Sequence, residues 1–161
     1  MSKDITNLQQ VEMLLKAGID PASCNLMSFR NRLLWMDDIE MRLPEHILAY
    51  IKDFPKSSFE SQLEYMHKYH VIPLWTTCAL LQTIPDSPKQ NIHLTRGGYD
   101  KPNANNPDEV KYLTDAYFAL YEYKDSSKNI LINRIFGGDS YTEATVNLTV
   151  AYLNEISAAI G

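Results

Sequence analysis

The clearest pattern of hydrophobic and polar positions in this chain runs from Ala116 to Gly161. The side chains over Ala116–Tyr123 and over Asn129–Phe136 predict the two strands of an antiparallel hairpin. The polar segment Lys124–Lys128 between them is the expected turn. A pair of glycines then predicts a sharp corner, and a helix is expected to begin near Tyr141.

The last helix is apolar around most of its circumference. Ser140 and Glu143 predict a capping box at its start. Its apolar residues fall on two sides, one with Leu148 and the other with Val146, and only a narrow wedge around Asn147 is polar. We therefore expect this helix to be buried on more than one side.

A first helix is predicted near the N-terminus. Apolar residues recur at helical spacing between Leu8 and Leu15. Thr6 is the expected N-cap, in a capping box with Gln9, and Gly18 is the expected stop.

Two further stretches have the character of strands. Leu26–Phe29 and Leu33–Met36 flank Arg30–Arg32, which predicts a short hairpin whose Asn31 tolerates a left-handed backbone. Asn91–Arg96 alternates between apolar and polar residues, which is typical of a half-buried strand.

Three helices are predicted in the middle of the chain. One runs from Pro44 to about Asp53. The second begins with a capping box of Ser57 and Glu60 and ends near Tyr69. The third is Pro73–Ile84, and an apolar stripe on it is expected to face the sheet: Leu74, Cys78 and Leu81.

A long polar segment separates the strand near residue 96 from the C-terminal hairpin. Arg96–Asn106 has the composition of a loop and is long for a compact domain, so we expect it to be mobile or functional. Pro107–Leu113 is predicted to form one or two helical turns capped by Asn106.

These elements predict an α+β fold in a single domain over residues 1–161. An antiparallel sheet of about four to five strands would be packed with the N-terminal, middle and C-terminal helices. Strands 91–96, 116–123 and 129–136 are expected to form a meander. The segment at about 41–70 is an extra helical part at one side.

Composition narrows the classes of function. The formal net charge is −5 and the pI about 5.3, and no cluster of Lys and Arg appears. Nucleic-acid binding is not expected, because phosphate contacts need a basic surface. The N-terminus lacks the apolar core of a signal peptide, and no apolar run approaches the length of a membrane span. Cys24 and Cys78 are expected to be reduced thiols in a cytoplasmic protein that does not bind membranes.

The order of parts also carries a resemblance. Its pieces are Leu14–Pro21, Pro73–Leu81, Tyr121–Tyr123 and Gly138–Ala144. This order resembles a loose set of uncharacterised small proteins from bacteriophages, prophages and Bacteroides-type gut bacteria. The match covers about half of the chain, the spacing of its middle helix departs a little, and Met41–Tyr69 is an addition. The resemblance implies a small α+β domain and no catalytic residues.

Glu64, His67 and His70 are the candidates for a metal site. They lie at i, i+3 and i+6 of the second middle helix, and a carboxylate with two imidazoles is a partial ligand set for a transition metal. No second Glu-x-x-His is present to complete a di-metal site. We therefore expect a solvated helix face, no metal and no cofactor.

The sequence offers weaker candidates for two other kinds of site, an anion-binding site and a nucleophilic catalytic site. The corner at Gly138 precedes a helix, where free N–H groups attract anions, yet Asp139 would repel phosphate and the glycines are explained by the turn. Nucleophilic catalysis would use Cys78 or a serine with His93 or His46. Cys78 is expected on the buried face of its helix and hence inert, and no catalytic residue is assigned.

The tyrosines leave three readings open. Tyr117, Tyr121 and Tyr123 share one face of a predicted strand, and Tyr99 lies in the long loop. A face covered by a helix would make the three strand tyrosines core residues. An open face would make the four a surface for binding a protein. Stacking on single-stranded nucleic acid is the third reading, and it needs more basic neighbours.

The sequence favours a small, non-enzymatic accessory protein of the phage or mobile-element type. It would bind an unknown partner protein or a second copy of itself. The alternative is a metal- or anion-dependent enzyme that uses Glu64, His67 and His70, or the corner at Gly138.

Overall fold

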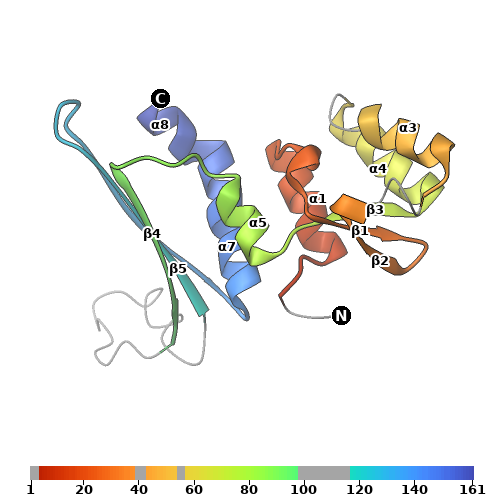
Figure 1. The fold of residues 1–161 in the computed structure, drawn as a ribbon. Helices are drawn as coiled ribbons and strands as arrows, with labels where there is room; N and C mark the ends of the chain where they lie inside the picture. Colours follow the sequence, from red (N-terminus) through yellow and green to blue (C-terminus); the bar gives the residue numbers. More distant parts are fainter. Residues whose placement is uncertain (1–3, 39–42, 54–56, 98–116) are drawn as a thin grey trace. The chain divides into compact units, whose positions relative to one another are not determined.

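The computed structural model describes residues 4–38, 43–53, 57–97 and 117–161 (Figure 1). The fold is α+β, as predicted. The chain divides into two compact units, Met1–Thr83 and Ile84–Gly161, and each is described here by itself. The described residues form two three-stranded antiparallel sheets, one in each unit, rather than one sheet of four to five strands.

The first unit contains most of the helices. Its sheet has the strand order β2-β1-β3, with both neighbours of β1 antiparallel to it. Its elements in chain order are α1 (Leu8–Ala17), η1 (Pro21–Ser23), β1 (Leu26–Phe29), β2 (Arg32–Trp35), η2 (Met36–Asp38), α3 (Glu45–Asp53), α4 (Phe59–Tyr69), β3 (Val71–Leu74) and α5 (Thr77–Gln82).

Two helix starts differ by one residue from the prediction. Asn7, not Thr6, caps α1, and its capping box is completed by Gln10. Thr6 instead is buried, and its Oγ1 accepts the backbone N–H of Trp75 at 3.0 Å. Ser58, not Ser57, caps α4. Local capping signals therefore located these helices but not their first residue.

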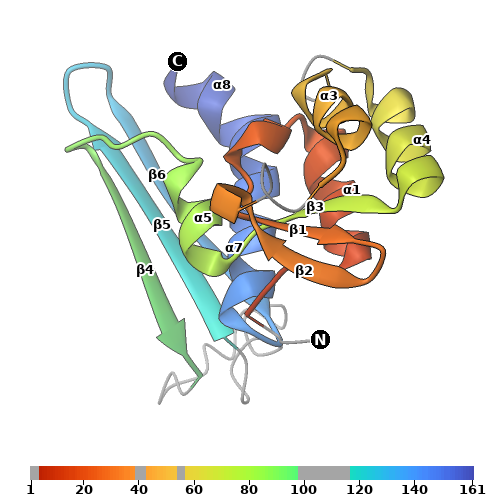
Figure 2. The same ribbon diagram turned by 45° about the vertical axis from the view of Figure 1, so that its right-hand side comes forward.

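The β1–β2 hairpin is confirmed, and its turn is shorter than expected (Figure 2). Arg30 and Asn31 form a two-residue connection with φ of 50° and 66°. Positive φ at both positions is the signature of a type I′ turn, whose twist matches that of the strands. Arg32 belongs to β2.

The segment around Pro73 is a strand rather than the start of a helix. Val71–Leu74 forms β3, in which Pro73 lies opposite Met27 of β1. A proline is tolerated there because β3 is an edge strand of this sheet. The helix α5 begins later, after an N-cap at Thr76, and this shift changes which residues face inward. Cys78, predicted to be buried, is exposed.

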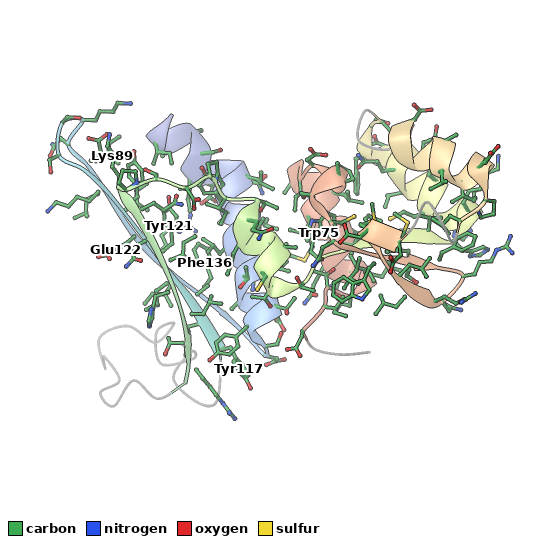
Figure 3. All side chains as sticks on the ribbon, in the orientation of Figure 1. Trp75, Lys89, Tyr117, Tyr121, Glu122 and Phe136 are labelled. Atoms are coloured by element: carbon green, nitrogen blue, oxygen red, sulfur yellow. The ribbon has the colours of Figure 1, made fainter. Side chains whose placement is uncertain are left out.

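The sheet of the first unit has apolar neighbours on both faces. Met27 and Val71 pack in a core cluster with Leu43 and Ile47, the latter from α3. On the other face, α1 and α4 contact β3. Trp75, directly after β3, is fully buried, and its Nε1–H donates to Ser23 Oγ at 3.0 Å (Figure 3).

The second unit is a meander followed by a helix, as predicted. Its strand order is β4-β5-β6. The elements are β4 (Gln90–Arg96), β5 (Tyr117–Asp125), β6 (Ile130–Gly138), α7 (Tyr141–Ala151), the π-helical η4 (Tyr152–Ile156) and α8 (Ser157–Ile160). The expected turn narrows to residues 126–129, because Lys124 and Asp125 still pair with β6.

The helix α7 covers one face of this sheet. Tyr121 and Phe136 point from the strands toward α7, whereas Glu122 points away (Figure 3). The predicted burial on more than one side is confirmed, because Val146 and Leu148, which lie on opposite sides of α7, are both buried. Residues 98–116, which include most of the predicted long loop and the helical turns after it, lie outside the described residues.

Candidate functional site

The first unit contains a cavity of about 810 Å³ that is partly open to solvent. Its walls come from α1 and α4, and its floor comes from the sheet. Leu8 and Glu12 contribute from α1, where their i, i+4 spacing places both on one face. Leu63, Met66 and His67 contribute from α4 at the spacing of one helical face.

The floor of the cavity continues into an exposed apolar surface on the same face of the sheet. Ser28 and Ile72 line the cavity and lie opposite each other on β1 and β3. Leu33 lies opposite Ser28 on the other side, so its side chain shares this face, as does that of Trp35 two residues on. Leu33 is 54% exposed and Trp35 is 56% exposed. We call the cavity together with Leu33 and Trp35 the groove.

The end of the groove is formed where the β1–β2 turn meets the end of α4. The backbone N–H of Arg30 donates to the carbonyl of His70 at 3.0 Å. His70 ends α4 with φ of 53°, a left-handed conformation that is costly for a residue other than glycine. Arg30, Asn31 and His70 all line the cavity. Three polar residues of the lining, two from the turn and one from the end of α4, thus have left-handed backbone.

The lining has many hydrogen-bond donors and one acidic group. Asn31 supplies an amide, and His67 and His70 supply imidazoles, whereas Glu12 is the single carboxylate. Arg30 also lines the cavity, and its guanidinium lies over the ring of Phe29, with Cζ 5.2 Å from the ring centroid. The apolar part of the lining is formed by Leu8, Leu63, Met66 and Ile72. The arrangement fits a ligand that has an apolar part and several oxygen acceptors.

The structure brings together two of the three predicted metal candidates. His67 and His70 both line the cavity, and Glu64 is exposed outside its lining. Within the described ranges, no group of three or more His, Cys, Asp or Glu side chains could hold a metal ion. Each of the two imidazoles carries a ring N–H that can donate a hydrogen bond.

The strand tyrosines do not form an exposed row. Tyr121 and Tyr123 are buried against α7, which is the core alternative. Burial raises the pKa of Tyr121 to about 12, and its hydroxyl donates to Gln90 Oε1 at 2.7 Å. Tyr117 is half-buried, in edge-to-face contact with Tyr141 at 4.7 Å between ring centroids. Tyr99 lies outside the described residues.

The corner before α7 uses its own side chains to satisfy the helix start. Ser140 Oγ accepts the N–H of Glu143, and the carboxylate of Glu143 accepts the N–H of Asp139. A Cβ at Gly138 would lie 2.7 Å from the backbone nitrogen of Ala144. The glycine is required by this close approach, and two of the donors that an anion would need already have acceptors.

The two cysteines differ in burial, which bears on whether either could act as a nucleophile. Burial raises the pKa of the Cys24 thiol to about 12, so this thiol stays protonated and unreactive at neutral pH. Cys78 is exposed on α5, and His93 is exposed on β4. The side chain of His46 lies outside the described residues.

Sequence reasoning missed most of the groove. It singled out His67 and His70 but gave no role in a binding site to Arg30, Asn31 or Leu33. One signal was present in the sequence: Leu33 and Trp35 both follow the hairpin turn at the i, i+2 spacing of a strand face. That spacing puts two large apolar residues on one side of a hairpin.

No helix formed by the described residues is long and apolar enough to cross a membrane. Comparisons with models of known families, with curated proteins and with solved structures found no match. The resemblance to phage and Bacteroides-type proteins accordingly stays a prediction.

Proposed function

We propose that this chain is a non-enzymatic binding module whose groove holds a short acidic segment of another protein. The segment would place an apolar side chain between α1 and α4. Its carboxylates and backbone carbonyls would accept hydrogen bonds from Arg30, Asn31 and the two imidazoles. This binding role agrees with the sequence-based prediction of an accessory protein, and the groove is the feature that supports it.

The observation that carries the proposal is the continuity between the cavity and the exposed pair Leu33 and Trp35. The register puts Leu33 next to the cavity-lining Ser28 on the same sheet face. A small molecule would need only the enclosed part. An apolar strip that continues onto β2 fits a longer chain segment, and exposed Trp is enriched where proteins bind one another.

The chemistry of the lining selects an acidic segment. The chain as a whole carries a formal net charge of −5, yet the lining has one carboxylate and a larger number of donors. Arg30 is the permanent charge among them, and a guanidinium recognises carboxylates through two parallel hydrogen bonds. Basic segments would be repelled by Arg30 and would have only Glu12 as a counter-charge, so they should bind more weakly.

A random peptide library displayed on yeast and sorted with the labelled protein tests the proposal. We expect enriched peptides to combine a large apolar residue with Asp or Glu. Binding of the synthetic peptides is then measured by calorimetry and by a blue shift of Trp35 emission. Arg30→Asn should lower affinity about tenfold, the loss expected for one charge-assisted hydrogen bond. Asparagine also suits the left-handed backbone of the turn.

Matched variants separate the groove from other surfaces. Leu33→Glu replaces an exposed apolar side chain with a negative charge and should weaken binding of an acidic segment without unfolding the protein. Lys128→Asn removes a positive charge from an exposed position of the second unit and should leave affinity unchanged. Peptides that bind Arg30→Asn and Leu33→Glu as tightly as the original chain would contradict the proposal. Stoichiometric metal that disappears in His67→Ala would replace it with the metal-dependent alternative.

A further inference from the structure

The strand β6 is an edge of its sheet, with β5 on one side and no strand on the other among the described residues. It is nine residues long. On the face away from α7, Leu131 is 66% exposed and Ile135 is 44% exposed, and Asn133 between them is exposed as well. A long edge with exposed apolar residues is a template for pairing with another strand.

The register shows which backbone groups of β6 point away from β5. In β5, the N–H of Lys124 donates to the carbonyl of Lys89, so Lys124 faces β4. Neighbouring residues of a central strand face opposite sides, so Tyr123 and Asp125 face β6 and bond Ile132 and Ile130. The even-numbered residues of β6 therefore face β5. The N–H and carbonyl groups of Leu131, Asn133 and Ile135 point outward from the edge.

We propose that β6 pairs antiparallel with β6 of a second copy of this chain, about a two-fold axis at Asn133. A two-fold axis at an outward-facing residue makes that residue a hydrogen-bonded pair with itself. Leu131 then lies opposite Ile135 of the second copy, and Ile135 lies opposite its Leu131. The outward N–H and carbonyl groups of Leu131, Asn133 and Ile135 are then satisfied at once, by about six backbone hydrogen bonds.

The side chains and the backbone favour a two-fold axis at Asn133 over an axis at either of the next two residues. With the axis at Asn133, the two exposed apolar residues of each copy cover those of the other. The positive Arg134 lies opposite Ile132 of the second copy, so no like charges face each other across the pair. An axis at Arg134 is excluded because the backbone groups of Arg134 face β5. An axis at Ile135 would leave Leu131 beyond the end of the partner strand.

Sedimentation across a range of protein concentrations tests the pairing. The single chain has a mass of 18.5 kDa, and we expect the mean mass to rise toward twice that value with concentration. Asn133→Pro removes an outward N–H at the axis, and a proline is tolerated at such an edge position. Ile135→Lys places a charge on the edge without touching the core. Each should raise the dissociation constant at least tenfold.

A crosslink tests the register independently of stability. In a Cys78→Ser background, Asn133→Cys should form a disulfide-linked dimer on mild oxidation, because paired residues have Cα atoms about 5.5 Å apart. Glu122→Cys is the matched control: it is exposed on the same face but one strand inward, so its copies lie three strand spacings apart, roughly 14 Å. A mass that stays at one chain at every concentration overturns the proposal. So does a dimer that Asn133→Cys fails to link, or that Glu122→Cys links equally well.

Discussion

The two sheets of this protein differ in strand length and in what surrounds them. In the first unit, strands of four residues have helices on both faces, with α3 over one and α1 and α4 over the other. In the second unit, β5 and β6 are nine residues long, α7 covers one face, and Glu122, Leu131 and Ile135 are exposed on the other.

The difference shows two ways in which a small sheet can present a binding surface. Short strands end early, so side chains from a turn and from helix ends gather around a hollow, as Arg30 and His70 do. Long strands instead expose a row of regularly spaced backbone groups along an edge. A groove recognises side chains, whereas an edge recognises another backbone. We propose a segment of another protein as the ligand of the first unit, and a second copy of the chain as the partner of the second unit.

The largest expected effect is the loss of Trp75, and the other tryptophan of the first unit, Trp35, is its control. Trp75→Ala should lower the free energy of unfolding by about 3–5 kcal/mol, because it empties a fully buried site and removes the bond to Ser23. Trp35→Ala should cost well under 1 kcal/mol, since its side chain is mainly exposed. Urea unfolding followed by circular dichroism measures both. Equal losses would show that the burial of the two residues is misassigned.

Each unit contains a glycine whose replacement should lower the free energy of unfolding, and the physical cause differs between the two. Gly138→Ala should destabilise the second unit by about 1–3 kcal/mol, because the new Cβ would meet backbone and side-chain atoms at 2.7–2.8 Å. Gly18→Ala in the first unit has nothing within 4 Å and should cost about 1 kcal/mol from its φ of 95° alone. Thermal unfolding with each variant ranks them. A Gly138→Ala protein as stable as the original would contradict the close approach.

His70 provides a test of strain in the groove. His70→Gly should raise the free energy of unfolding by about 0.5 kcal/mol, because glycine accepts φ of 53° and the gain exceeds its entropic cost. The same variant should weaken binding of the acidic peptides. Asn129→Gly, at φ of 54° in the second unit, is the control and should leave peptide binding intact. A stabilised His70→Gly that binds fully would remove His70 from the site.

The smallest expected effect concerns pH and the tip of the second unit. Asp125 is buried and accepts hydrogen bonds from Ser127 and Lys89, which lower its pKa well below the ordinary range. A folded-state pKa below the unfolded value of about 3.9 stabilises the fold above that pH, and the stabilisation is lost as pH falls through the folded value. Asp125→Asn should flatten stability between about pH 4 and pH 2. An unchanged acid profile would contradict this role.

The elements that could be predicted from sequence are those with strong local signals. The β5–β6 hairpin has two long strand segments around a polar turn, and the Ser140 cap fixes the start of α7. The Pro73 segment could not be assigned locally, because a proline suits both the first turn of a helix and an edge strand. The pattern of a strand also does not identify the strand with which it pairs. The sequence therefore predicts one larger sheet where the structure has two small ones.

The groove could be predicted only in part. His67 and His70 stood out because they are three residues apart on one helix. The cavity, however, joins α1, the β1–β2 turn and the end of α4, which are far apart along the chain. The turn and the end of α4 come together through the left-handed residues Arg30 and His70. Arginine and histidine do not favour that conformation, so the sequence does not predict it.

The π-helical segment Tyr152–Ile156 has a consequence for how the chain tolerates insertions and deletions. Leu148, Tyr152 and Ile156 recur every fourth residue and all belong to one core cluster. In a regular α-helix this spacing rotates the buried row by about 40° at each step. The π-helical turn is wider by about one residue, and this extra residue reduces the rotation, so Leu148, Tyr152 and Ile156 all face the core cluster. Deleting one residue within this segment would restore a regular helix and leave Ile160 on the side that packs against the core cluster. The bulge is therefore the place where this helix can lose a residue without turning its last residues away from the core.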